Sequence, residues 1–150
     1  MMKKLILLIL LIPSLTLAGH PLAFIVYNQA ASKEPVVIVL ETLKDSSWEI
    51  KCEDSIASND KKSVCTGAIE LEDSSSQLHG RISLYFSKNT PENLIGQSEY
   101  TLNNTPTLGE PNWHWSNPET LIIPKIENKK TIVKFHVVDT DSIIVHLLPP

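Results

Sequence analysis

Residues 131–148 show the clearest pattern in the chain: two runs in which apolar and polar positions alternate, separated by Asp139-Thr140-Asp141. A period of two indicates a β-strand with one buried face, and two such runs joined by a short polar turn predict a β-hairpin. A three-residue turn places 137 opposite 143, 135 opposite 145 and 133 opposite 147. In this register one face is apolar throughout: Val133, Phe135, Val137, Ile143, Val145 and Leu147.

Other segments also have the length and composition of strands, and none beyond the first 20 residues has a convincing helical period. Residues 21–28 and 36–42 are apolar on both faces, which favours positions in the middle of a sheet. Residues 78–86 alternate strictly, and Gly96 in the next run indicates a bulge or a close contact. The remaining candidate strands are residues 48–52, 65–71, 94–102 and 120–124.

This succession of short strands predicts an all-β chain. The expected architecture is an antiparallel β-sandwich of about eight or nine strands, with a small β-barrel as the alternative. A length of 150 residues suits one domain with a single core.

The start of the chain combines Lys3 and Lys4 with an apolar run over residues 5–17, followed by the small residues Ala18 and Gly19. This order is typical of a secretory signal peptide, and the run is shorter than the ~20 residues of a membrane-spanning helix. We therefore expect residues 1–18 to be removed during export. Residues 19–150 should form one domain that does not insert into a membrane, in a bacterial periplasm or outside the cell.

The charge of the exported chain narrows the range of partners. Without Lys3 and Lys4 it has 11 basic residues against 17 acidic ones, a formal charge of −6. This balance disfavours nucleic acid and electrostatic binding to an anionic membrane as partners.

Cys52 and Cys65 are the only cysteines, and in an oxidising compartment they predict one intrachain disulfide. Each lies on the apolar face of a strand pattern, so we expect a hairpin that pairs 52 with 65, with residues 53–64 as its loop. A redox pair is more often CxxC, and the sequence places no set of zinc ligands nearby.

Residues 103–119, NNTPTLGEPNWHWSNPE, are the longest segment without a predicted strand. Loops of this length in a compact domain are usually functional or disordered, and two tryptophans argue against disorder. The rings could form a flat platform for a sugar ring or a protein side chain, with hydrogen bonds from neighbouring polar residues. The candidate ligand-binding residues are Asn112, Trp113, His114, Trp115 and Asn117.

The alternative is that one or both tryptophan rings fill the open end of the sandwich. We expect Trp115 to anchor the segment, because it is nearer to the predicted strand at residues 120–124, and Trp113 to be the exposed ring.

The histidines are a second candidate group. His136 and His146 are diagonal neighbours on the polar face of the C-terminal hairpin, and His79 lies on the polar face of another predicted strand. If these strands were adjacent, three imidazoles could converge on zinc or copper. Lys134 shares their face and no HxH or HExxH spacing occurs, so we favour solvent-facing histidines and expect no metal or cofactor.

Catalytic signatures are missing from the sequence: it contains no GxSxG, no P-loop and no GxGxxG. We therefore expect an exported, non-enzymatic binding module, a secreted effector or an inhibitor, that contacts a protein or a glycan through residues 103–119. The alternative is a small hydrolase or a metal-binding protein that uses His79, His136 and His146.

Overall fold

The computed structural model of the chain describes residues 20–116, 131–139 and 141–149. These residues form β-strands and one 3-10 turn at Pro91–Asn93, and no α-helix. The strands are β1 (His20–Pro21), β2 (Ala23–Asn28), β3 (Val36–Lys44), β4 (Ser47–Ile56), β5 (Lys61–Val64), β6 (Glu70–Leu71), β7 (Gln77–Phe86), β8 (Leu94–Asn104), β9 (Trp113–Trp115), β10 (Ile132–Asp139) and β11 (Ser142–Leu148). The predicted leader and the predicted strand at residues 120–124 lie outside the described residues.

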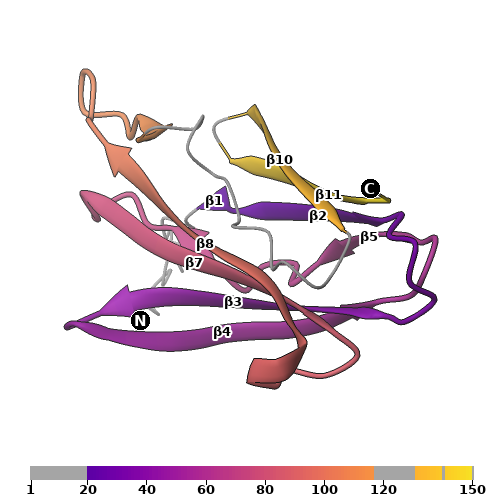
Figure 1. The fold of residues 1–150 in the computed structure, drawn as a ribbon. Coiled ribbons are helices and arrows are strands. Elements are labelled where there is room, and N and C mark those ends of the chain that lie inside the picture. The colour runs from indigo at the N-terminus through magenta and orange to yellow at the C-terminus, as the bar shows by residue number, and fades with distance from the viewer. Residues whose placement is uncertain (1–19, 117–130, 140, 150) are drawn as a thin grey trace, which may run out of the picture.

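The strands form two larger sheets and one short pair. The five-stranded sheet has the order β4-β3-β7-β8-β9, the four-stranded sheet has the order β10-β11-β2-β5, and β1 pairs with β6. Figure 1 shows the two larger sheets facing each other, with β3 and β4 on the far side of the core from β2 and β11. A single hydrophobic core contains residues from both sheets, as in a β-sandwich.

One pairing differs from the antiparallel prediction. The five-stranded sheet is antiparallel throughout, but β2 lies parallel to β11, with Val26 opposite Val145. The four-stranded sheet is therefore mixed, and the five-stranded sheet is antiparallel. A parallel pair needs a long connection, and here nearly the whole described chain separates the two strands.

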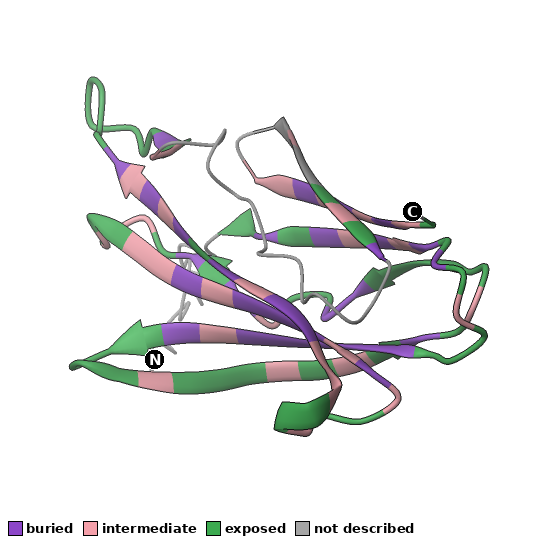
Figure 2. Cartoon of the chain, viewed as in Figure 1, coloured by how far each residue is buried: buried purple, intermediate pink, exposed green. Residues whose placement is uncertain are grey.

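The core consists of the inward positions of both sheets, which Figure 2 colours as buried along the facing strands. In β3 the first five residues are all buried, as predicted for an apolar run in the middle of a sheet. β2 alternates more clearly, but it also lies between two neighbours. The largest fully buried side chains are Leu22, Phe24, Ile38, Leu40, Ile56, Leu71, Ile82, Leu84, Leu102, Ile143 and Leu147.

The C-terminal hairpin has the predicted register. β10 and β11 pair with 137 opposite 143, 135 opposite 145 and 133 opposite 147, and the register shifts between Val137 and Asp139. Of the two alternatives expected at Gly96, a bulge or a close contact, the structure shows the bulge. There the pairing of β7 with β8 passes from Leu84–Gly96 to Tyr85–Leu94.

The Cys52–Cys65 disulfide is confirmed, with its Cα atoms 5.8 Å apart, but the hairpin predicted around it is wrong. β4 pairs with β3, which places Leu40 opposite Cys52, and β5 belongs to the other sheet. The disulfide therefore ties an edge strand of one sheet to the end of an edge strand of the other. Two edge strands on the same side of a sandwich bring their cysteines together as well as a hairpin does.

Asp54 holds the same edge of the sandwich. Its Oδ1 accepts a hydrogen bond from Lys62 Nζ at 2.7 Å, and its Oδ2 accepts one from the backbone N–H of Cys65 at 3.3 Å. Burial opposes ionisation, but the bonds from Lys62, Ser55 and Cys65 outweigh it and lower the pKa of this carboxyl below 3.8. The ionised form therefore stabilises the junction between the sheets.

None of the described residues lies in a helix that is long and apolar enough to cross a membrane.

Candidate functional site

The segment predicted as a strandless loop contains a hairpin. β8 continues to Asn104, the chain turns back, and β9 pairs with β8, so that Asn104 lies opposite Trp113 and Leu102 opposite Trp115. Residues 105–112, called the tip hairpin below, connect the two strands, and every one of them is exposed. Figures 1 and 2 show this connection projecting beyond the end of the five-stranded sheet, exposed along its whole length.

The turn of the tip hairpin is closed by two backbone hydrogen bonds. The N–H of Glu110 donates to the carbonyl of Thr107 at 3.0 Å, and the N–H of Thr107 donates to the carbonyl of Glu110 at 2.9 Å. The two central residues both have positive φ, 53° at Leu108 and 80° at Gly109. Such turns strongly prefer Asn-Gly, Asp-Gly or Gly-Gly.

Leucine is therefore an unfavourable residue for position 108. A left-handed conformation costs a residue with a Cβ about 1–2 kcal/mol. Burial offers no compensation, because Leu108 is 99% exposed. The other described residues with positive φ, glycines apart, are small or polar: Asp45, Ser46, Asn59, Cys65 and Ser87.

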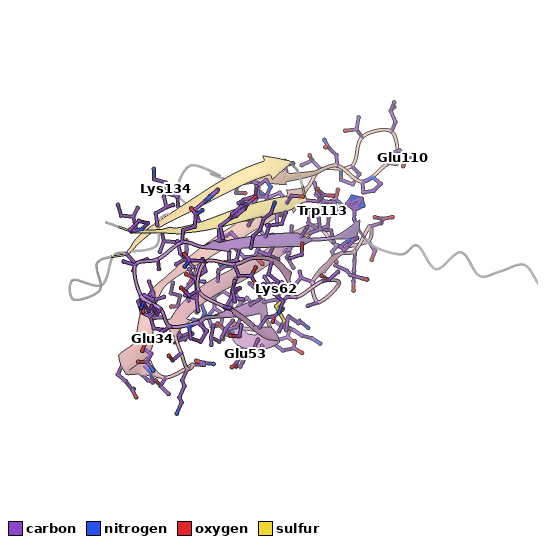
Figure 3. All side chains as sticks on the ribbon, turned by 90° about the vertical axis from the view of Figure 1, so that its right-hand side faces the viewer. Glu34, Glu53, Lys62, Glu110, Trp113 and Lys134 are labelled. Carbon is purple, nitrogen blue, oxygen red and sulfur yellow. A yellow bond between two sulfur atoms is a disulfide. The ribbon has the colours of Figure 1, made fainter. Side chains whose placement is uncertain are left out.

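The base of the tip hairpin is fixed by the buried side chain of Asn104. Its Oδ1 accepts a hydrogen bond from the N–H of Asn112 at 2.8 Å, and its Nδ2 donates to the carbonyls of Asp73 and Ser75 at 3.3 and 2.9 Å. The N–H of Thr105 also donates to the carbonyl of Asn112 at 2.9 Å. These bonds hold the hairpin in a defined direction. In Figure 3, Glu110 marks its tip at a distance from the rest of the molecule.

The two tryptophans do not form an open platform. They alternate with His114 along β9, so both rings face the core side and His114 points outward and is exposed. Trp113 is only 8% exposed, whereas Trp115 is partly buried, with its ring 5.6 Å from that of Tyr100. The expected roles are thus reversed, because Trp113 is the more deeply buried ring. Asn112 is exposed, and Asn117 lies outside the described residues.

Tyr100 supports Trp115 from β8, and sequence analysis missed it. Its ring contacts Phe24 of the four-stranded sheet as well as Trp115 of β9. Gly80, the neighbour of Tyr100 on β7, leaves the space that the tyrosine ring fills. Burial raises the pKa of the Tyr100 hydroxyl, which is buried and has no hydrogen-bond partner among the described residues. A glycine opposite an aromatic residue within an alternating strand pattern was the available signal.

A groove of about 580 Å³ lies beside Trp113. The ends of β3 and β4 line it with Thr42, Glu49 and Lys51, and the segment at residues 67–72 lines it from another element. Its charges are mixed, since Lys51 pairs with Glu49 at 3.2 Å. The indole Nε1 of Trp113 is buried, and no hydrogen-bond partner for it lies in the described part of the chain.

The histidines do not converge. His79 lies on β7 of the five-stranded sheet, whereas β10 and β11, which carry 136 and 146, belong to the other sheet. The side chain of His136 is outside the described part of the structure. His79 instead contacts Glu99 at 3.1 Å, and His146 stacks on Tyr27. The convergence considered from the sequence is therefore wrong, because it required adjacent strands.

Among the described residues, no group of three or more His, Cys, Asp or Glu side chains could hold a metal ion. On the outer surface of the five-stranded sheet, charged and aromatic side chains contact one another. Arg81 donates to Glu41 through two nitrogens at 2.7 and 2.9 Å and lies over the ring of Trp48. The hydrogen bonds to Glu41 outweigh burial and raise the pKa of Arg81.

Comparison with models of known protein families, with curated proteins and with solved structures finds no match.

Proposed function

We propose that the chain is an exported binding protein without catalytic activity and that the tip hairpin is its contact for another protein. The observation that carries this proposal is Leu108, which combines almost complete exposure with a backbone conformation that disfavours leucine. Folding gains nothing from leucine at this position. A side chain of this kind on a rigid projection suits insertion into an apolar pocket of a partner.

The burial of the tryptophans favours a protein over a glycan as the partner. Sugar recognition of the kind expected from the sequence requires an accessible ring face, but Trp113 is buried and Trp115 packs on Tyr100. The exposed groups at this end instead include Leu108, Glu110 and His114. One apolar side chain with polar neighbours resembles the anchor and rim of a protein interface.

The groove beside Trp113 adds a second contact at the same end of the sandwich. Its mixed lining of Leu78, Glu49 and Lys51 suits a polypeptide segment of the partner better than a purely apolar ligand. The disulfide and the predicted leader support export. We propose that the exported protein acts either as a secreted effector or as an inhibitor. Mass spectrometry of the exported protein tests this step, since the chain should begin at Gly19.

The contact is tested by Leu108→Asn. Asparagine tolerates positive φ in such turns, so the variant should melt at the same temperature as the unmodified protein or higher. Both proteins are immobilised and exposed to native periplasmic and culture-medium fractions, and bound proteins are quantified by mass spectrometry. We expect a protein that the unmodified chain enriches and that Leu108→Asn loses.

Ile50→Asn is the matched control, because Ile50 is also an exposed aliphatic residue, on the five-stranded sheet away from the hairpin. It should retain the partner. If all three proteins enriched the same set, the tip hairpin would not be the contact.

A further inference from the structure

The outer surface of the four-stranded sheet is basic and partly apolar. Its outward side chains alternate with the buried ones, and none of those described is a carboxylate. This is unusual in a chain with 17 acidic residues, and the aliphatic content is high for a solvent-facing sheet surface. This basic face consists of Ala23, Ile25, Tyr27, Lys61, Ser63, Ile132, Lys134, Ser142, Ile144, His146 and Leu148.

One row of the basic face runs straight across all four strands. The register places Lys134 opposite His146, His146 opposite Tyr27 and Tyr27 opposite Lys61. The rings of Tyr27 and His146 stack at 4.9 Å, and Lys61 Nζ lies 4.8 Å from the tyrosine ring centre. The two lysines are therefore held three strand spacings apart, roughly 14 Å.

The opposite surface of the sandwich, called the acidic face, has the complementary pattern. On the outward positions of β4, β3, β7 and β8, Glu53 and Glu99 are exposed, Glu99 contacts His79 at 3.1 Å, and Arg81 is paired with Glu41. Glu53 and Glu99 also lie three strands apart, again roughly 14 Å sideways. The acidic face also exposes aliphatic and aromatic surface: Leu43, Trp48 and Ile50.

We propose that the basic face binds the acidic face of a second copy of this chain. Lys134 and Glu53 lie on opposite sides of the molecule in Figure 3, so each copy presents one face of each kind. Among the outward side chains that are described, two basic faces would bring four lysines together without a carboxylate, and two acidic faces would repel equally. Pairing of a basic face with an acidic face places lysines opposite carboxylates. It leaves one free face at each end of the assembly.

The size of the faces sets the strength of this association. Four strands at ~4.8 Å and about six residues at ~3.3 Å give roughly 400 Å² of flat area per partner, or ~800 Å² in total. That area is below the range of stable complexes and corresponds to a transient contact. The assembly should therefore grow gradually with concentration and shrink as salt screens the charges.

Sedimentation velocity tests the proposal from low micromolar to millimolar concentration. The protein is purified in its exported form, after any cleavage by the cell. The average mass should rise without a plateau at the dimer and fall at high salt. Lys61→Glu with Lys134→Glu should weaken association roughly a hundredfold, because like charges would then face each other. Glu53→Lys with Glu99→Lys should do the same.

Mixing the two double variants is the decisive arm, because each then supplies the face that the other has lost. Association should return, although both variants keep a net negative charge. Lys33→Glu with Lys88→Glu makes the same charge change at exposed positions outside both faces and should associate normally. Melting curves establish that each variant is folded. The salt dependence of association is measured on the unmodified protein, so this test holds even if a variant does not fold.

Three results would overturn the proposal: a monomer at all concentrations, a plateau at the dimer, or no recovery on mixing. If the lysine variant abolished association and the glutamate variant did not, the basic face would bind another acidic surface of the second copy, and pairing with the acidic face would be wrong.

Discussion

Gly80→Ala should destabilise the protein, although alanine normally improves a strand. Gly80 lies on the inner surface of β7, and the ring of Tyr100 occupies the place where a side chain would begin. An added Cβ would overlap Cζ and Oη of Tyr100 and lie 2.6 Å from Cε2. Carbon atoms in contact are normally about 3.5–4.0 Å apart, so the ring or the strand must move.

The magnitude follows from two opposing effects. Replacing glycine by alanine within a strand favours folding by about 0.5–1 kcal/mol. Overpacking a filled core costs about 1–3 kcal/mol, and expulsion of an aromatic ring about 3–5 kcal/mol. Tyr100 is buried and its ring contacts those of Phe24 and Trp115, so moving it disturbs both neighbours. We expect a net loss of about 2–4 kcal/mol in the free energy of unfolding.

A double-mutant cycle in urea, followed by tryptophan fluorescence, measures this effect. Tyr100→Leu removes all three atoms that the new Cβ would meet, so Gly80→Ala should be neutral or slightly stabilising in that background. The two substitutions should therefore couple by about 2 kcal/mol or more. Equal effects of Gly80→Ala in both backgrounds would refute the steric explanation, and so would a neutral effect in the unmodified protein.

Three further predictions concern the core and the edge of the sandwich. Tyr100→Phe should leave the free energy of unfolding unchanged or raise it, because the removed hydroxyl is buried and no described residue hydrogen-bonds to it; urea titration measures this. Cys52→Ala with Cys65→Ala should lower the free energy of unfolding by about 3 kcal/mol. In the unmodified protein, thiol titration after denaturation without reduction should find no free thiol. The pKa of Asp54 is lowered on folding, so its contribution is present above pH 3.8 and is lost as pH falls through the folded pKa. Asp54→Asn should therefore cost stability at neutral pH, and melting curves should show the difference shrinking in acid.

Parts of the fold that depend on local alternation could be predicted from the sequence. The register of β10 with β11 follows from matching apolar positions, because a slip by one residue would turn every side chain to the wrong face. The position of β3 in the middle of a sheet follows from five consecutive apolar residues, all of which are buried in the structure. These features require only neighbouring residues and a period of two.

Contacts between distant strands could not be predicted in the same way. Alternation identifies a strand but not its neighbour, so Cys52 and Cys65 fitted a hairpin as well as the observed link between two sheets. The parallel pairing of β2 with β11 has no local signature either. At the candidate site, Trp113-His114-Trp115 already had the period of a strand, but the prolines before it obscured this.

The same reasoning explains why the tip hairpin, and not its tryptophans, is the stronger functional candidate. Packing explains the tryptophans, since β9 turns both rings toward the core. Packing does not explain Leu108, because this residue has a positive φ and is almost fully exposed. Residues that violate local rules without structural gain are expected at functional positions, because selection for folding alone would replace them. The buried base at Asn104 completes the argument, because its hydrogen bonds hold this unfavourable residue on a rigid support where a partner can meet it.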